Sequence, residues 1–107
     1  MTAEQTTKEN LEQRLKKSFP GAKKLDNFPE FDCIVVPMSK MDLISGKLKT
    51  LVETIKKYEE DKGYKLTDLN KSVNDYFSLT YERNSSKHTI NIDGFFPGQV
   101  NIYYNGE

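Results

Sequence analysis

The sequence predicts an α+β two-layer sandwich, with helices packed on one face of a four-stranded, mainly antiparallel sheet. Two observations favour this class. Over residues 73–104, apolar and polar residues alternate through three short runs separated by turn-forming residues, as in a C-terminal β-meander. Over residues 44–58, apolar residues recur at helical spacing. The expected element order is α-β-α-(α)-β-β-β, in which the helix in parentheses is short.

The bulk composition is that of one small folded domain. The chain has 107 residues, of which 36% are hydrophobic, enough for one modest core. We expect a single domain over residues 1–107, with the polar residues 1–5 disordered. Sixteen basic residues balance sixteen acidic ones. No overall field would therefore draw the protein to nucleic acid or to an anionic membrane.

Cysteine content and hydropathy indicate the compartment. The single Cys33 cannot form an intramolecular disulfide, and no apolar leader segment is visible at the N-terminus. The longest apolar run is far too short to cross a bilayer. We therefore expect a cytoplasmic protein without a membrane partner, and no cofactor motif suggests a bound cofactor.

The first predicted helix covers residues 7–18. Thr6 and Glu9 have the spacing of a capping box, in which each side chain accepts a hydrogen bond from the backbone of the other residue. Pro20 and Gly21 then end the helix. Residues 22–30 show no clear period and are expected to be a connection, and the β-branched run 31–36 is expected to be a strand inside the sheet.

The central helix has the strongest pattern in the chain. Ser39 followed by Asp42 is a capping signal, Ser45-Gly46 offers a second possible start, and Gly63 lies where a left-handed C-terminal cap is expected. The expected apolar face comprises Ile44, Leu48, Leu51, Val52, Ile55 and Tyr58. Such a helix should pack on the sheet.

Residues 64–72 are ambiguous, since two leucines three apart fit a short helix while 65–67 could equally be extended. We expect the short helix. The three strands after it are predicted to turn at 84–86 and at Pro97-Gly98, the latter fitting a type II turn. Their expected inward residues are Phe77, Leu79, Tyr81, Ile90, Ile92, Val100, Ile102 and Tyr104.

No catalytic constellation has a convincing spacing, so we expect a protein that is not an enzyme. Cys33 lies in the most apolar run and is expected to be a buried small hydrophobe. His88 is expected to be a partly buried histidine at the sheet rim, because nothing places a nucleophile beside it. His88, Glu82 and Asp93 fall within one hairpin, but His88 and Asp93 have opposite parity, so no metal site is predicted.

The opposite face of the meander is the surface of most interest. It has few charges and two tyrosines, a composition typical of interface cores but also of a solvated sheet face. Phe95 and Phe96 beside it would be either a plug closing the sandwich or an exposed anchor. The candidate interaction residues are Tyr76, Ser78, Thr80, Asn91, Phe95, Phe96, Asn101 and Tyr103.

Together these features predict a small intracellular protein-binding or regulatory module, such as an inhibitor, an adaptor or a homodimer. An accessory protein of a phage or mobile element would suit these properties. The alternative is nucleic-acid binding through the densest basic cluster, and a small enzyme using His88 ranks last. The basic cluster consists of Arg14, Lys16, Lys17, Lys23 and Lys24.

Overall fold

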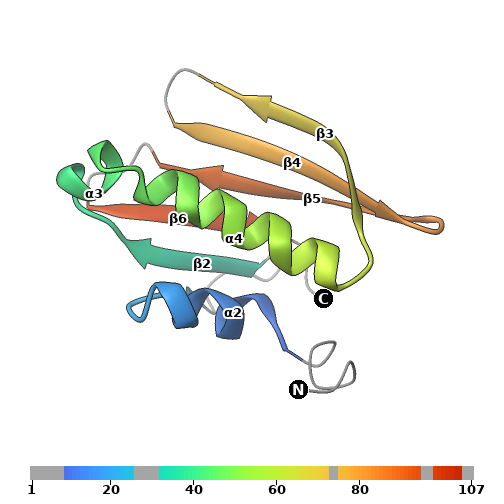
Figure 1. The fold of residues 1–107 in the computed structure, drawn as a ribbon, viewed down its shortest axis with the longest axis horizontal. Coiled ribbons are helices and arrows are strands. Elements are labelled where there is room, and N and C mark those ends of the chain that lie inside the picture. The colour runs from blue at the N-terminus through green and yellow to red at the C-terminus, as the bar shows by residue number, and fades with distance from the viewer. Residues whose placement is uncertain (1–8, 26–31, 73–74, 95–97, 105–107) are drawn as a thin grey trace.

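The computed structural model describes residues 9–25, 32–72, 75–94 and 98–104. Within them the α+β class is confirmed, with the helices gathered on one face of a sheet (Figure 1). The helices are α2 (Leu11–Ser18), α3 (Lys40–Ile44) and α4 (Lys47–Asp61). The strands are β1 (Lys23–Leu25), β2 (Asp32–Pro37), β3 (Lys65–Lys71), β4 (Tyr76–Arg83), β5 (Ser86–Asp93) and β6 (Gln99–Tyr104).

The sheet has six strands in the order β1-β2-β6-β5-β4-β3, and every neighbouring pair is antiparallel. The C-terminal meander is confirmed in β4, β5 and β6. The predicted number of four strands is wrong, because β1 and β3 add one strand at each edge. The last strand, β6, lies inside the sheet between β5 and β2.

The region expected to be a short helix, residues 64–72, is instead the edge strand β3. It pairs with β4 along nearly its whole length, and its register shifts between Leu66 and Asp68. Most of its side chains are exposed, so the strand carries little of the apolar alternation by which strands are recognised. Pairing with the free edge of β4 overrides the weak helical spacing of Leu66 and Leu69, and Leu69 is left exposed.

The segment expected to be a connection also contains a strand. The three residues of β1 pair with residues 33–35 of β2. A run of three residues is too short to show a period, so the prediction missed it. As expected, β2 lies inside the sheet, with β1 on one side and β6 on the other.

The first helix begins later than predicted. Within the described residues it begins at Leu11, and Asn10 forms the capping box with Gln13. The Asn10 side chain accepts from the Gln13 backbone at 2.8 Å, and the Gln13 side chain accepts from the Asn10 backbone at 2.9 Å. Asparagine is among the best N-cap residues, which explains the later start. Thr6 lies outside the described residues.

The central helical region is divided in two. Ser39 and Asp42 cap α3 as predicted, with reciprocal hydrogen bonds of 2.9 and 3.1 Å. Gly46 then takes a left-handed conformation with φ of 94° and separates α3 from α4. The prediction that Ile44 belongs to the buried face is wrong, because it ends α3 and is 71% exposed. Gly63 after α4 has the predicted positive φ, 86°.

The turns of the meander follow the predicted chemistry where they are described. Asn84, with φ of 56°, begins the tight connection between β4 and β5, and asparagine tolerates this left-handed conformation well. The loop is shorter than predicted, because Ser86 already belongs to β5. Gly98 has φ of 82°, as the third residue of a type II turn requires, while Pro97 lies outside the described residues.

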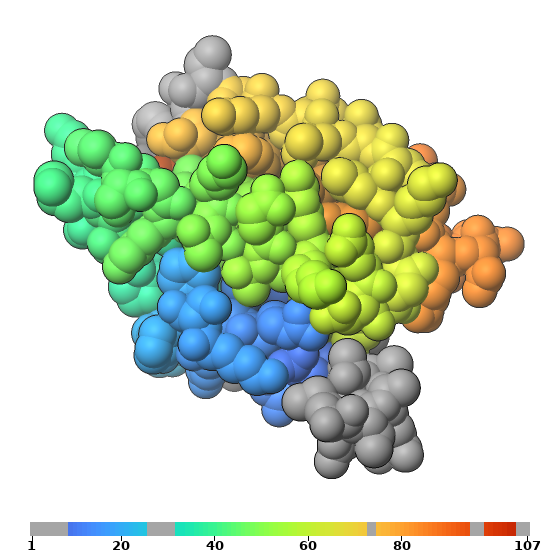
Figure 2. All heavy atoms as spheres, viewed as in Figure 1, coloured from blue at the N-terminus to red at the C-terminus, as the bar shows by residue number. Residues whose placement is uncertain are grey.

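The core lies between the sheet and the helices. Seven of the eight predicted inward residues of the meander are buried, and Phe77 is partly buried against them. They pack under Leu48, Leu51, Val52 and Ile55 of α4. In Figure 2, which shows the helix side, α2, α3 and α4 cover nearly all of β2 and β6. One face of the sheet is therefore closed by helices.

Arg14 ties α2 to α4. Its guanidinium group donates to Glu9 Oε1 at 2.7 Å and to Asp61 Oδ2 at 2.9 Å, and it lies 5.6 Å from the ring centre of Tyr58. Lys17 adds a second contact to Glu9, at 2.6 Å. Burial alone would raise the pKa of the Glu9 carboxyl, but hydrogen bonds from Lys17 and Arg14 and their positive charges bring it below its ordinary value.

We predict that Glu9→Gln lowers the free energy of unfolding at pH 7 by about 1 kcal/mol, because a partly buried carboxylate loses its charged partners. The folded-state pKa of Glu9 lies below its ordinary value of 4.5. Its contribution is therefore complete above that pH and is lost as the pH falls through the folded-state pKa. Urea unfolding at pH 7 and at lower pH values should show the two proteins converging in acid.

Glu53→Gln is the matched control, because Glu53 is largely exposed and, among the described residues, its one ion pair is with Lys56, at 3.8 Å. It should leave stability nearly unchanged at both pH values. A constant difference between Glu9→Gln and the parent protein across the acid range would contradict the assignment.

Candidate functional site

The uncovered face of the sheet brings together the predicted interaction residues of the meander. Alternate residues of β4, β5 and β6 point away from the helices, since their neighbours on each strand are the buried core residues. No described helix lies on this side (Figure 1). Strand register places side by side on this face Tyr76, Ser78, Thr80, Asn91, Asn101 and Tyr103.

A row without formal charge crosses this face from one edge strand to the other. Asn91 of β5 is paired with Ser78 of β4 on one side and with Tyr103 of β6 on the other. The row extends through Ser78 to Asn70 of β3, and through Tyr103 to Cys33 of β2 and Leu25 of β1. We call these six residues the uncharged row.

Charged side chains lie around the uncharged row, not within it. The next row along the strands contains Asp93 of β5 and ends at Lys23 of β1. On the other side, Asp68 lies at the β3 edge, and Glu82 and Lys87 face each other near the β4–β5 turn. The sequence had predicted few charges on this face. The structure adds lysines at its margin, because β1 and β3 extend it.

Hydrogen bonds between side chains order the middle of this face. Along β6, Gln99 Nε2 donates to Asn101 Oδ1 and Asn101 Nδ2 donates to Tyr103 Oη, both at 2.9 Å. Between β4 and β5, the hydroxyl oxygens of Thr80 and Thr89 lie 3.2 Å apart. Asn101 is only 9% exposed even though no described helix covers it. The surface therefore has a defined shape.

The other two predicted interaction residues, Phe95 and Phe96, lie outside the described residues. The two alternatives for this pair, a plug that closes the sandwich or an exposed anchor, stay predictions.

The basic cluster does not form a free cationic surface among the described residues. Lys16 pairs with Glu12 at 3.2 Å, and Lys24 pairs with Asp32 at 3.4 Å. Arg14 and Lys17 bind acidic side chains on α4 and ahead of α2, as described above. Lys23 is separated from these groups, because it lies on the uncovered side of the sheet, opposite Val35. Nucleic-acid binding through this cluster stays a prediction without geometric support.

Cys33 is buried, as predicted, at 1% exposure. Burial raises the pKa of its thiol, so the reactive thiolate is disfavoured. It is a member of the uncharged row, whereas His88 belongs to the side chains under the helices. The sheet separates the two, and they cannot act as a nucleophile and its base.

His88 is partly buried at one end of the sheet and binds a residue that the sequence analysis did not identify. Its Nε2 lies 3.0 Å from Oε2 of Glu59, whose side chain is 6% exposed. The rings of Tyr64 and Tyr81 flank the imidazole at 4.5 and 6.0 Å between centres. The sequence did contain a signal for this residue. Glu59 follows Ile55 by four residues and so lies on the apolar face of α4.

In the described part of the chain, no three of His, Cys, Asp and Glu come together as metal ligands. No helix there is long and apolar enough to cross a membrane.

No protein-family model, no curated protein and no solved structure matches this chain. The function must therefore be argued from its own geometry.

We predict that His88 and Glu59 stabilise the fold as a pair. Each single change to alanine should lower the free energy of unfolding by about 1–3 kcal/mol, since each leaves a polar partner unmatched beneath α4. In a double-mutant cycle measured by urea unfolding, the coupling energy should be about 1 kcal/mol. A parallel cycle of Glu59→Ala with Lys87→Ala, an exposed neighbour, should show no coupling. Additive effects in the first cycle would contradict the pairing.

Proposed function

We propose that this chain is a small, non-enzymatic protein-binding module that contacts its partner through the uncovered face of the sheet. The observation that carries the proposal is the uncharged row, which crosses all six strands and is bordered by charged side chains. Cys33 is buried within this row, and its other five members are at least partly exposed. A centre depleted of charge inside a polar margin is the usual anatomy of a protein interface.

The size of this face supports a protein partner. Strands lie about 4.8 Å apart and rise about 3.4 Å per residue, so five strands of six to eight residues and one of three present roughly 600 Å². A standard interface buries about 800 Å² on each partner. The face, with a contribution from its rim, is large enough for one such contact.

The side chains of this surface are already held in place, which also supports a role in protein binding. Tyrosine and asparagine offer both apolar area and hydrogen-bonding groups, and they are common contact residues in binding surfaces. The hydrogen bonds from Gln99 to Asn101 and from Asn101 to Tyr103 hold three of these side chains in place before any partner arrives. Such preorganisation reduces the entropy lost on association.

The sheet edges are less suited to binding than the face. β1 offers only three residues at one edge. At the other edge, β3 carries lysines at both ends and an irregular register between Leu66 and Asp68. Short strands, edge lysines and bulges are features that oppose strand addition. We therefore assign partner binding to the face.

Asn91→Lys tests the proposal, because it places a charge in the middle of the uncharged row. We expect it to weaken partner binding by about 10- to 100-fold, since an unpaired ammonium group would be buried in the contact. The partner is sought by affinity capture from native lysate. The mass of the purified protein in solution shows whether that partner is a second copy, and titration calorimetry then compares the variants.

Thr50→Lys is the matched control, because it also converts a neutral polar residue to lysine but lies on the exposed side of α4. It should bind like the parent protein. Equal binding by the Asn91→Lys and parent proteins, with both folded by circular dichroism, would show that this face is only a solvated surface.

A further inference from the structure

The outward side chains of β4 and β5 carry charge only at the two ends of these strands. Near the β4–β5 turn, Lys87 lies opposite Glu82, and at the far end Asp93 lies opposite Tyr76. The outward side chains between these ends are neutral and bear hydroxyl or amide groups, namely Ser78, Thr80, Thr89 and Asn91. A surface that lies on these strands must therefore offer complementary charge at the ends and neutral polar groups in the middle.

The same face of a second copy meets this requirement. In a two-fold dimer one surface is used twice, so each contact occurs in both directions. If the strands of the two copies run in opposite directions, Lys87 of each copy lies over Asp93 of the other. If they run in the same direction with β5 over β4, Lys87 of each copy lies over Glu82 of the other. In both arrangements the lysine meets a carboxylate, and no charge of β4 or β5 lies over one of the same sign.

The uncovered face as a whole carries no net charge on its described strands. Three lysines and three acidic residues point outward from it, and they are Lys23, Lys65, Lys87, Asp68, Glu82 and Asp93. The whole chain also has a formal net charge of zero at pH 7. Two copies therefore approach each other without overall repulsion, and a net charge near zero promotes association.

The area of this face suits a reversible dimer. Two faces of roughly 600 Å² would bury at most about 1,200 Å² in total, which is the lower limit for a standard interface. Each copy already has its own core between the sheet and the helices, so burial of apolar surface does not require the second copy. A contact of this size between polar faces is typical of a weak association between proteins that also exist as monomers.

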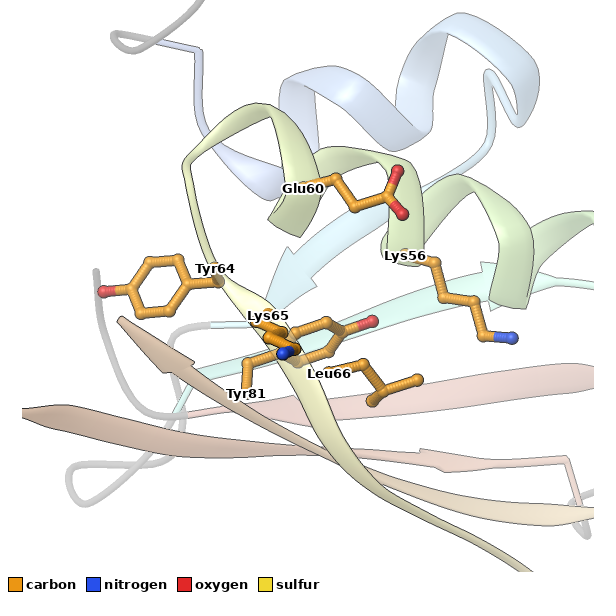
Figure 3. Close-up of a pocket in the computed structure, with 6 residues that line it drawn as sticks. All are labelled: Lys56, Glu60, Tyr64, Lys65, Leu66 and Tyr81. Atoms are coloured by element: carbon orange, nitrogen blue, oxygen red, sulfur yellow. The ribbon is translucent and has the colours of Figure 1, made fainter. Parts of the chain in front are cut away.

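The described part of the helix side offers no comparable surface. A pocket of about 330 Å³ lies there between α4 and the beginning of β3. Figure 3 shows Lys56 and Glu60 on α4 above it and the ring of Tyr81 beneath them. Lys56 is already paired with Glu53, at 3.8 Å, and Tyr81 is 1% exposed. This pocket is small and its floor is closed, so a second copy lies more favourably on the face without helices.

We propose that the partner of the uncovered face is a second copy of this chain, stacked face to face about a two-fold axis with Lys87 of each copy against a carboxylate of the other. This inference rests on the proposed function and names its partner. Packed sheets keep their strand directions within about 30°, and a lysine side chain is long enough to follow that offset. Thr80, Thr89 and Asn91 then lie in the centre of the contact, where their polar groups face those of the other copy.

Sedimentation equilibrium of the full chain tests for the dimer. Between about 1 µM and about 1 mM protein, the mass should rise reversibly from monomer to dimer, with a Kd of about 10–100 µM. A monomeric mass over this whole range would overturn the inference. It would leave the proposed function standing, because a different protein could still bind the face, and capture with the Asn91→Lys variant tests that separately.

Lys87→Glu tests whether the dimer uses this face. It should weaken dimerisation at least about tenfold, because it sets two carboxylates against each other at both symmetric contacts. Lys49→Glu is the matched control, since it makes the same change at an exposed lysine of α4, on the other side of the sheet. It should dimerise like the parent protein. Equal dimerisation of Lys87→Glu and the parent, with both folded by circular dichroism, would overturn the inference.

Mixed variants test whether the charges of the two copies face each other. Lys87→Glu should recover a dimer when mixed with Asp93→Lys if the strands of the two copies run in opposite directions. It should recover one with Glu82→Lys if they run in the same direction, because each mixture restores both opposite-charge contacts. Native mass spectrometry with one variant isotopically labelled identifies the mixed dimer. Recovery in one mixture supports the inference, and recovery in neither would overturn it.

Discussion

The pairing of β6 with β2 is the constraint on which the rest of the structure depends. Six residue pairs join the segment 99–104 to the segment 32–37, which are far apart in sequence. The pairing joins the last strand of the meander to the β1–β2 pair, so that both parts share one sheet and one core. Without it, α4 would have no continuous apolar surface to cover, and the uncharged row would end at Tyr103.

The two faces of this sheet differ in chemistry because helices cover only one of them. Under α4 the side chains are mainly apolar, and the polar exceptions lie together near the end of the helix. Glu59 is matched by His88, whereas the hydroxyl group of Tyr81, opposite His88 on the neighbouring strand, has no hydrogen-bond partner among the described residues. Natural proteins keep such a local inconsistency chiefly where it serves a function.

The uncovered face presents a different chemistry. It relies on short polar side chains that bond to one another, and its charges lie at the margin. An ordered surface with an uncharged centre suits a protein partner.

The sequence alone determined the fold class, the inward faces of β4, β5 and β6, the capping of α3 and the burial of Cys33. These features depend on local periodicity and local hydrogen bonds, which residues close in the chain specify by themselves. Only the tertiary structure decided the edge strands β1 and β3, the exposure of Ile44, and the pairing of Glu59 with His88. An edge strand forms because a neighbour offers a free edge, and a buried hydrogen-bonded pair forms because packing brings distant residues together. The uncharged row likewise exists only through strand register, which no local pattern contains.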